Sequence, residues 1–480
     1  MTFAPLVRRT KIVCTIGPAT ESEAQLRALI ARGMNVARLN FSHGDHAGHA
    51  AVVDRVRVLT GELGVAIAIL QDLAGPKVRI GALADGWVEL EAGQAFTLTT
   101  RAVLGSRERA SVSWGGLPGE LEPGDALLVA DGTIELAVEG VSGDEIRCRV
   151  VVGGRLGSRK GINVPSGLAG MPILGEKDLE DLRFAVERGV DYVGLSFVRD
   201  AADVRTARTR IEALGGRVPL IAKIETRAAL ERFDEILDAA DGIMIARGDL
   251  SIETPFARVP VVQKRLIAEA SCRAKPVITA THMLLSMVSA PHPTRAEVAD
   301  VANAILDGSD AVMLSEETAI GEHAARAVEV MAAIALETEA AGVEAPARRA
   351  DAARATGDEA AVAHAACQLA ARLAAAVIVI VTRSGETARL AAQQRPAQPI
   401  LAPTGAPEVY RRLALVRGVT PLLLPAEAGD LEALLGAVRR ASHRYGWEGR
   451  RAVFLSARPR LDGHALRRRP EVCSADGVTS

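Results

Sequence analysis

Eight short apolar runs constrain the fold of this 480-residue chain more than any other feature of its sequence. Each run ends in polar or glycine residues and is followed by a stretch of helical periodicity, which is the pattern of βα units. The runs cover residues 12–16, 35–39, 66–71, 192–196, 219–223, 242–246, 276–280 and 310–314. Eight such units predict an α/β fold of the (β/α)8 TIM barrel type, in which functional residues follow the C-terminal ends of the strands.

Two segments depart from this pattern and predict further domains. Between the third and fourth runs, short alternating strands with turns indicate an inserted β-rich lid, whose glycine-containing ends could act as hinges. After a linker rich in Ala, Arg and Asp at 344–359, strands are expected at 377–381, 399–402, 419–424 and 452–455. We therefore expect a catalytic barrel from 1–73 and 157–342, a β-barrel-like lid from 74–156, and a C-terminal open α/β domain from 343–480.

Composition narrows the classes of partner. The 57 Lys and Arg residues nearly balance the 59 Asp and Glu residues, so the net charge of -2 predicts no binding to nucleic acid or to an anionic membrane. No signal peptide and no run of about 18 apolar residues is present, so no membrane span is expected. The five cysteines form no CxxC pair, which favours reduced thiols and a cytoplasmic protein.

Polar residues alternate at the end of the second expected strand. A period of two places Arg38, Asn40 and Ser42 on one face, where they could bind a phosphate. The segment is equally compatible with a polar barrel rim on which Ser42 or Asp45 caps the next helix. Three histidines follow at the start and on the outer face of that helix, a placement that does not favour a metal site: His43, His46 and His49.

Charged residues also gather where the lid leaves the barrel. Asp72 ends the third expected strand, and Lys77 and Arg79 follow it. These side chains either reach a nucleotide or form ion pairs across the hinge, and the segment alone does not separate the two interpretations.

The most specific cluster lies after the fifth and sixth expected strands. Lys223 and Glu225 are two residues apart, hence on one face, and Asp249 leaves the end of the neighbouring strand. Magnesium is often held by one or two carboxylates, with water and substrate phosphate completing its octahedron. A structural Lys223–Glu225 salt bridge would leave Asp249 unexplained. The amides of Gly248 and Asp249 could bind a carboxylate, and Thr281 leaves the next strand beside them, although a lone threonine is more often a helix cap.

From about Arg9 to Gly418 the chain closely resembles the pyruvate kinase family. The motifs occur in the family's order: RTKIVCTIGPAT, MNVARLNFSHG, DLAGPKVR, SRKGINVP, YVGLSFVR, AKIET, IMIARGDL, KPVITATHMLLSM, PTRAEVADVANAILDGSDAVMLSEETA and VTRSGETAR. The resemblance implies glycolytic, Mg²⁺- or Mn²⁺-dependent transfer of the phosphoryl group of phosphoenolpyruvate to ADP, which gives ATP and pyruvate.

The resemblance also implies roles for the residues at the barrel mouth. Arg38 would contact the phosphoryl group, and Lys223 would stabilise that group and the enolate. Glu225 and Asp249 would hold the magnesium. Thr281, together with the Gly248 and Asp249 amides, would bind the substrate carboxylate and could help relay a proton.

A second implied set surrounds the nucleotide and a monovalent cation. The nucleotide-binding positions are Asn40, His43, Arg79 and Lys160, and the monovalent-cation position is formed by Asn40, Ser42, Asp72 and Leu73. Many family members have glutamate where this chain has Lys77 and need potassium, whereas members with lysine work without it. We expect the Lys77 ammonium to replace the potassium charge.

Regulation and assembly are implied only by resemblance. The TRSGET segment is similar to a loop that binds phosphorylated effectors, but Glu386 would repel phosphate, so a sugar-phosphate effector stays open. Arg467 to Arg469 could bind an anion or belong to a solvated tail. Residues 291–304 resemble the region where family subunits meet, which implies a homotetramer.

Two other functions compete with this interpretation. A magnesium-dependent, pyruvate-type aldolase could use Glu225 and Asp249, but it explains neither the lid nor Arg38 and Lys160. A sensor could bind phosphoenolpyruvate or a sugar phosphate without turnover, but the intact catalytic positions speak against it.

Overall fold

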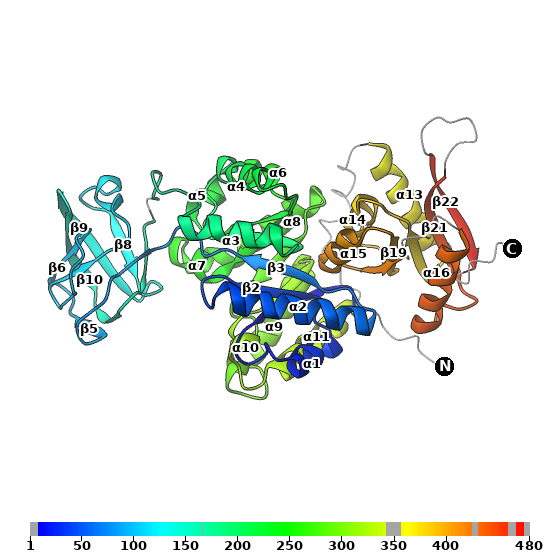
Figure 1. Cartoon of the computed structure of the whole chain (residues 1–480), viewed down its shortest axis with the longest axis horizontal. Helices are drawn as coiled ribbons and strands as arrows, with labels where there is room; N and C mark the ends of the chain where they lie inside the picture. The colour runs from blue at the N-terminus through cyan, green and yellow to red at the C-terminus, as the bar shows by residue number, and fades with distance from the viewer. Residues whose placement is uncertain (1–7, 166, 342–356, 425–430, 459–466, 475–480) are drawn as a thin grey trace.

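The computed structural model describes residues 8–165, 167–341, 357–424, 431–458 and 467–474. Three bodies lie in a row, with the β-rich lid at one end, the barrel in the middle and the C-terminal α/β domain at the other end (Figure 1). In the part of the chain that the structure describes, no helix has the length and apolar character needed to span a membrane.

The eight expected strands form one closed parallel barrel. Around the barrel their order is β1-β17-β16-β15-β14-β13-β3-β2. Their bounds are β1 (Lys11–Ile16), β2 (Val36–Asn40), β3 (Ala68–Asp72), β13 (Tyr192–Leu195), β14 (Leu220–Ile224), β15 (Gly242–Ala246), β16 (Val277–Ala280) and β17 (Ala311–Leu314). All strand residues are buried except the half-buried Asn40, which lies at the mouth. The TIM-barrel prediction is confirmed.

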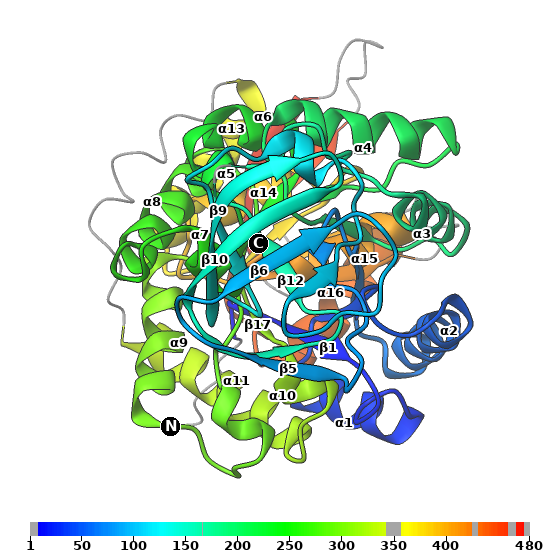
Figure 2. The same cartoon turned by 90° about the vertical axis from the view of Figure 1, so that its left-hand side faces the viewer.

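Helices surround this barrel, as the view from the lid end shows (Figure 2). They are α1 (Glu23–Arg32), α2 (His46–Leu63), α3 (Glu176–Glu187), α4 (Ala201–Ala213), α5 (Arg227–Glu231), α6 (Phe233–Ala239), α7 (Arg247–Glu253), α8 (Val259–Cys272), α9 (Arg295–Asp307), α10 (Glu316–Ala319) and α11 (Ala324–Ala340). Asp45, one of the two capping candidates, caps α2 by accepting a hydrogen bond from the Gly48 amide. Thr294 and Glu297 form a capping box at the start of α9.

The lid has its own sheets and its own apolar core. One sheet has the order β4-β12-β8-β9-β10-β6-β7, and β11 pairs with β5. The bounds are β4 (Val78–Arg79), β5 (Trp87–Leu90), β6 (Ala95–Thr99), β7 (Arg109–Ser111), β8 (Ala126–Val129), β9 (Ile134–Ser142), β10 (Glu145–Val152), β11 (Gly154–Gly157) and β12 (Gly161–Asn163). The chain enters the lid through Gly75, whose φ of 70° and close approach to Ser196 both require glycine.

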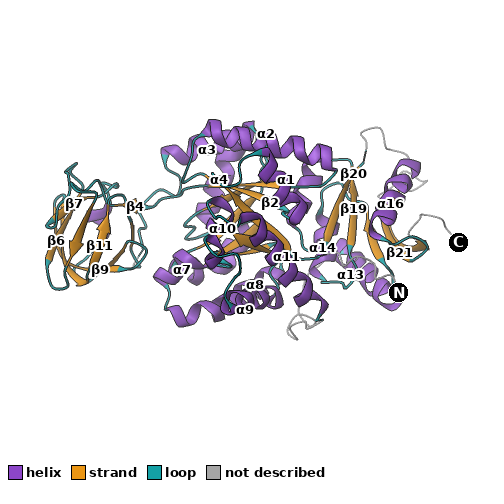
Figure 3. Cartoon of the chain, turned by 90° about the horizontal axis from the view of Figure 1, so that it is seen from below, coloured by secondary structure: helices purple, strands orange, loops and turns teal. Residues whose placement is uncertain are grey.

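The C-terminal domain is an open sheet with helices packed against it (Figure 3). The strand order is β20-β19-β18-β21-β22, and β22 runs antiparallel to β21. The bounds are α13 (Asp358–Arg372), β18 (Val377–Ile380), α14 (Glu386–Gln393), β19 (Ile400–Thr404), α15 (Pro407–Arg412), β20 (Val419–Leu423), α16 (Leu431–Tyr445), β21 (Arg451–Arg458) and β22 (Arg467–Ser474).

Arg467 to Arg469, for which the sequence left anion binding or a solvated tail open, begin the strand β22 and pair with β21. Most of the expected linker, 344–356, lies outside the described residues, and its last two residues, Asp358 and Glu359, begin α13.

A buried polar cluster lies where the barrel meets the C-terminal domain. Glu339 on α11 accepts hydrogen bonds from the Arg9 amide (2.8 Å) and from the Thr10 amide and hydroxyl (both 2.6 Å). Lys11 donates from Nζ to the Val419 carbonyl of β20 at 2.7 Å. Burial opposes ionisation of the Glu339 carboxyl, but the Thr10 and Arg9 hydrogen bonds outweigh it and lower its pKa. Glu339 therefore fixes the start of β1 in its charged form.

Candidate active site

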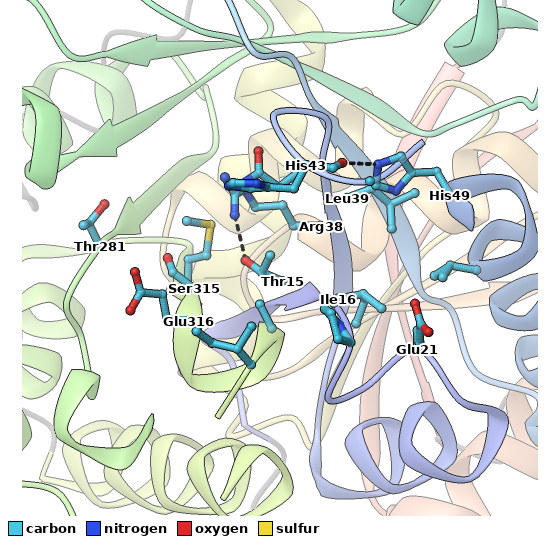
Figure 4. Close-up of a pocket in the computed structure, with 18 of the residues that line it drawn as sticks. Thr15, Ile16, Glu21, Arg38, Leu39, His43, His49, Thr281, Ser315 and Glu316 are labelled. Atoms are coloured by element: carbon cyan, nitrogen blue, oxygen red, sulfur yellow. Dashed lines mark hydrogen bonds between the residues drawn. The ribbon is translucent and has the colours of Figure 1, made fainter. Parts of the chain in front are cut away.

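A cavity of about 600 Å³ opens at the C-terminal ends of the barrel strands. Lys223, Glu225, Asp249 and Thr281 line one part of it, and Arg38 lies between them and the residues that line the other part, Glu21 before α1 and His49 in the first turn of α2. Figure 4 shows Arg38 directed toward Thr15, with Thr281 at one side and Glu21 and His49 at the other. The cavity thus collects side chains from several strand ends, as a barrel active site does.

Lys223 is the cation at the centre of the cluster. Its Nζ lies 3.0 Å from Glu225 Oε1 and 3.2 Å from Asp72 Oδ1, and it donates to Ser196 Oγ at 2.7 Å. The Lys223–Glu225 ion pair, which the sequence offered as a purely structural alternative, is therefore present, but as part of a larger network. Burial disfavours the ammonium, but Asp72 and Glu225 outweigh it and raise the pKa of Lys223 above its usual value. The network therefore favours the charged form of Lys223.

Asp72 holds a second cation beside the first. Arg38 donates from Nε to Asp72 Oδ2 at 2.7 Å and from Nη1 to Thr15 Oγ1 at 2.8 Å. Burial alone would raise the pKa of Asp72, but the charges of Lys223 and Arg38 keep that pKa below its ordinary value. One carboxylate therefore orients two cations toward the cavity, an arrangement suited to a phosphoryl group.

Two further carboxylates face the same cavity. Glu225 is 1% exposed and accepts the Phe197 amide at 2.8 Å, and its burial raises its pKa. Asp249 accepts Lys77 Nζ at 2.8 Å. Oxygen donors of this kind suit Mg²⁺ or Mn²⁺, and a pair of carboxylates leaves coordination positions for water and substrate. The donor set therefore fits a magnesium ion held by Glu225 and Asp249.

Backbone geometry is unusual beside this pair. Gly248 and Asp249 lie in the first turn of α7, and a Cβ on Gly248 would meet Thr281 Cγ2 at 2.8 Å. Thr281 and His282 both have positive φ, 75° and 56°. Such strain often occurs at functional sites, and here it places Thr281 close against the Gly248 backbone.

The nucleotide positions expected from the resemblance divide into two groups. Asn40 and His43 line the barrel cavity. Arg79 and Lys160 lie on the lid and do not line it: Arg79 donates to the Arg159 carbonyl at 3.3 Å, and Lys160 Nζ is 3.9 Å from Asp131.

The monovalent-cation positions lie where β2 and β3 end. Asn40 pairs with Asp72 across these strands, Leu73 follows Asp72, and Ser42 donates its amide to Asn40 Oδ1 at 3.2 Å. Lys77 forms its ion pair with Asp249, and its ammonium lies 5.5 Å from the centre of the Phe197 ring.

The histidines after β2 have other partners. His46 Nε2 lies 2.7 Å from Asp181 Oδ1, and His49 Nε2 lies 2.9 Å from the His43 carbonyl. Among the described residues, no group of three or more His, Cys, Asp or Glu side chains is arranged to hold a metal.

The sequence interpretation missed two residues of the site, Ser196 and Thr15. Ser196 donates to the Leu73 carbonyl at 2.8 Å and accepts from Lys223, and Thr15 accepts from Arg38. Both belong to C-terminal ends of barrel strands or directly follow one. The rule that placed the other residues would therefore have found them, although hydroxyl groups are too common to stand out by type.

Comparisons with known proteins agree with this architecture. The family model for the pyruvate kinase barrel domain matches residues 7–328, and that for the pyruvate kinase alpha/beta domain matches residues 360–457. Pyruvate kinase 2 of Synechocystis is 47% identical over 87% of this chain and 71% of its own length. A pyruvate kinase of Mycobacterium tuberculosis is 44% identical over 85% and 86%. The crystal structure of a pyruvate kinase from Cryptosporidium parvum superposes with a TM-score of 0.90 at 35% identity, covering 99% of both chains.

Proposed function

The chain belongs to the pyruvate kinase family, and we propose that its barrel-mouth site transfers the phosphoryl group of phosphoenolpyruvate to ADP. The observation that carries the proposal is the cluster of Lys223, Arg38, Glu225 and Asp249 around one cavity. Two fixed cations and two carboxylates suit phosphoryl transfer, which depends mainly on positioning and charge stabilisation. An aldolase would have no use for Arg38 or for the lid.

Each residue has a distinct part in this reaction. Arg38, held by Asp72 and Thr15, binds the phosphoryl oxygens. Lys223 stabilises the charge that spreads over the transferring group and then the enolate oxygen. The Gly248 and Asp249 amides and Thr281 orient the substrate carboxylate, and Thr281 helps move a proton to the enolate carbon. A magnesium or manganese ion held by Glu225 and Asp249 would neutralise phosphoryl and enolate charge when bound.

The lid completes the nucleotide site by closing. Arg79 and Lys160 are both mainly exposed on the lid, whereas Asn40 and His43 lie on the barrel. A rotation about Gly75 and the outgoing strand β12 would bring the lid cations toward the phosphates of ADP. Closure would also exclude water, which otherwise competes with ADP for the phosphoryl group.

Lys77 supplies the positive charge that a potassium ion supplies in other family members. It reaches the site from the lid hinge, and its ammonium already pairs with Asp249 at 2.8 Å. Because Lys77 is part of the chain, its positive charge is present without the binding of a free cation. We therefore expect turnover without potassium.

We further propose that the protein is a homotetramer. Whether a sugar phosphate controls its activity is decided by the assay described below. Apolar side chains are exposed around α8 and α9, among them Phe256 (83%), Val261 (69%) and Val298 (37%), which favours a subunit interface there. Glu386 begins α14 at the effector-type loop, where its charge would weaken phosphate binding. Light scattering tests the oligomeric state.

The deciding assay is pyruvate formation from phosphoenolpyruvate and ADP with magnesium, in sodium-only and potassium-containing buffers, with and without sugar phosphates. Turnover in both buffers supports the kinase function and the role of Lys77. Turnover only with potassium keeps the enzyme and discards that role. No turnover in any buffer would contradict the kinase function and favour a sensor.

A further inference from the structure

Helix α7 connects the metal-binding carboxylates to both hinges of the lid. At its start, Asp249 accepts Lys77 of the incoming hinge. At its end, Glu253 faces Asn163, the last residue of the outgoing strand β12. The two hinge strands are themselves paired, because Val78 of β4 lies opposite Ile162 of β12. A displacement of the lid is therefore felt at both ends of this short helix.

Glu253 also contacts the other metal-binding segment. Its Oε2 accepts the amide of Arg227 at 3.1 Å, and Arg227 is two residues beyond Glu225. Its Oε1 lies 3.5 Å from Asn163 Nδ2. Asn163 is 5% exposed, and its own Oδ1 has no hydrogen-bond partner among the described residues. One carboxylate thus joins the turn after Glu225, the helix that carries Asp249, and the lid.

A carboxylate in this place is costly to the fold. It lies at the C-terminal end of a helix, where a negative charge is disfavoured. Burial raises the pKa of Glu253 to about 7, against the opposing hydrogen bonds from Arg227 and Asn163. Two negative groups near Glu253, Asp249 and Glu225, repel its carboxylate. The three nearby cations already have carboxylate partners: Arg227 pairs with Glu231, Lys77 with Asp249, and Arg199 with Asp203. A glutamine would accept the Arg227 amide without this cost.

We infer that Glu253 is a positioning residue for the divalent-metal site, and that it couples the lid's outgoing strand to the placement of Glu225 and Asp249. The inference rests on the proposed function, because that function assigns the metal to these two carboxylates. When ionised, Glu253 accepts from both Arg227 and Asn163. When protonated, Glu253 loses its negative charge, so its hydrogen bond with Asn163 becomes a weaker neutral one and the lid contact loosens.

The test is direct binding of Mn²⁺ to the full chain without substrates, measured from the EPR signal of free Mn²⁺ between about pH 6 and pH 8. Glu253→Ala removes both contacts and should weaken Mn²⁺ binding about 10-fold, at the low end of the roughly 10–100-fold loss that follows removal of a direct partner of a metal ligand. Glu253→Gln keeps the acceptor for the Arg227 amide and should recover most of that loss. It should also gain less affinity with rising pH than the wild type does.

Two further variants complete the design. Glu231→Gln is the matched control. Glu231 and Glu253 both line a second cavity of about 360 Å³, but the Glu231 side chain is 62% exposed. The Glu231→Gln variant should therefore bind Mn²⁺ as the wild type does. Asn163→Ala should weaken binding in the same direction as Glu253→Ala.

The outcomes separate the inference from the function beneath it. If Glu253→Ala and Glu253→Gln both match the control in affinity and pH profile, the inference is wrong and the metal site stands. If Asn163→Ala binds as the wild type does, the coupling to the lid is wrong. If the wild type does not bind Mn²⁺, or if Asp249→Asn binds it equally well, the proposed metal site is wrong, and the inference is wrong with it. Should Glu253→Ala not fold, the pH profile of Glu253→Gln decides.

Discussion

Replacing Glu339 by glutamine should destabilise the barrel strongly. The carboxylate is 4% exposed and accepts three short hydrogen bonds from Arg9 and Thr10. A glutamine keeps only one acceptor oxygen. Its NH₂ group takes the place of the other oxygen and cannot accept the hydrogen bonds that this oxygen received. Breaking a buried charged interaction from one side costs about 3–5 kcal/mol. At about 2–4 °C per kcal/mol for a large domain, the melting temperature should fall by roughly 6–20 °C.

Differential scanning calorimetry at neutral pH measures this change. Glu337→Gln is the matched control, because Glu337 lies on the same helix but is exposed, and its melting temperature should stay close to that of the wild type. The pKa of Glu339 is lowered in the folded state, so its contribution is complete above the unfolded value of about 4.5 and disappears as the pH falls through the folded pKa. The gap between wild type and Glu339→Gln should therefore narrow below about pH 4.5. A fall no larger than that of the control would refute the reasoning.

Three other changes test the site, the hinge and a helix cap. Lys223→Met should lower kcat about 10²–10³-fold with a much smaller effect on Mn²⁺ binding, and equal loss of both would indicate a structural role. Gly75→Ala places a Cβ 2.7 Å from Ser196 Cβ at a positive φ, so both thermal stability and kcat should fall; unchanged values would show that the hinge tolerates the side chain. Thr294→Ala removes the capping box with Glu297 and should cost about 1 kcal/mol in chemical denaturation, whereas no change in midpoint would argue against the cap.

Much of the barrel and its mouth could be predicted because each strand signals its own end. Lys223 ends a buried run, and Asp249 follows the next one, so their convergence needs only the closure of the barrel. The sharing of Asp72 between Arg38 and Lys223 could not be predicted, because it depends on the rotamers of side chains from three strands, β2, β3 and β14.

Other features depend on the placement of whole bodies. The sequence shows that Arg79 and Lys160 are charged. Whether they reach the cavity depends on the orientation of the lid relative to the barrel, which no local sequence pattern determines. The strand β22 was missed because its arginine-rich start lacks the apolar alternation of a strand, and its pairing with β21 supplies the order that its own residues do not.

The insertion of the lid between β3 and β13 also bears on how the chain reaches its fold. These neighbouring barrel strands must meet across a long interval, since Ile69 donates its amide to Asp191, 122 residues later. Closing so long a loop costs chain entropy and slows folding. The lid has a core of its own, and its first and last strands, β4 and β12, lie side by side. Once the lid has folded, the end of β3 and the segment that leads to β13 are held close together. The two parts of the barrel can then pair across a much shorter effective loop.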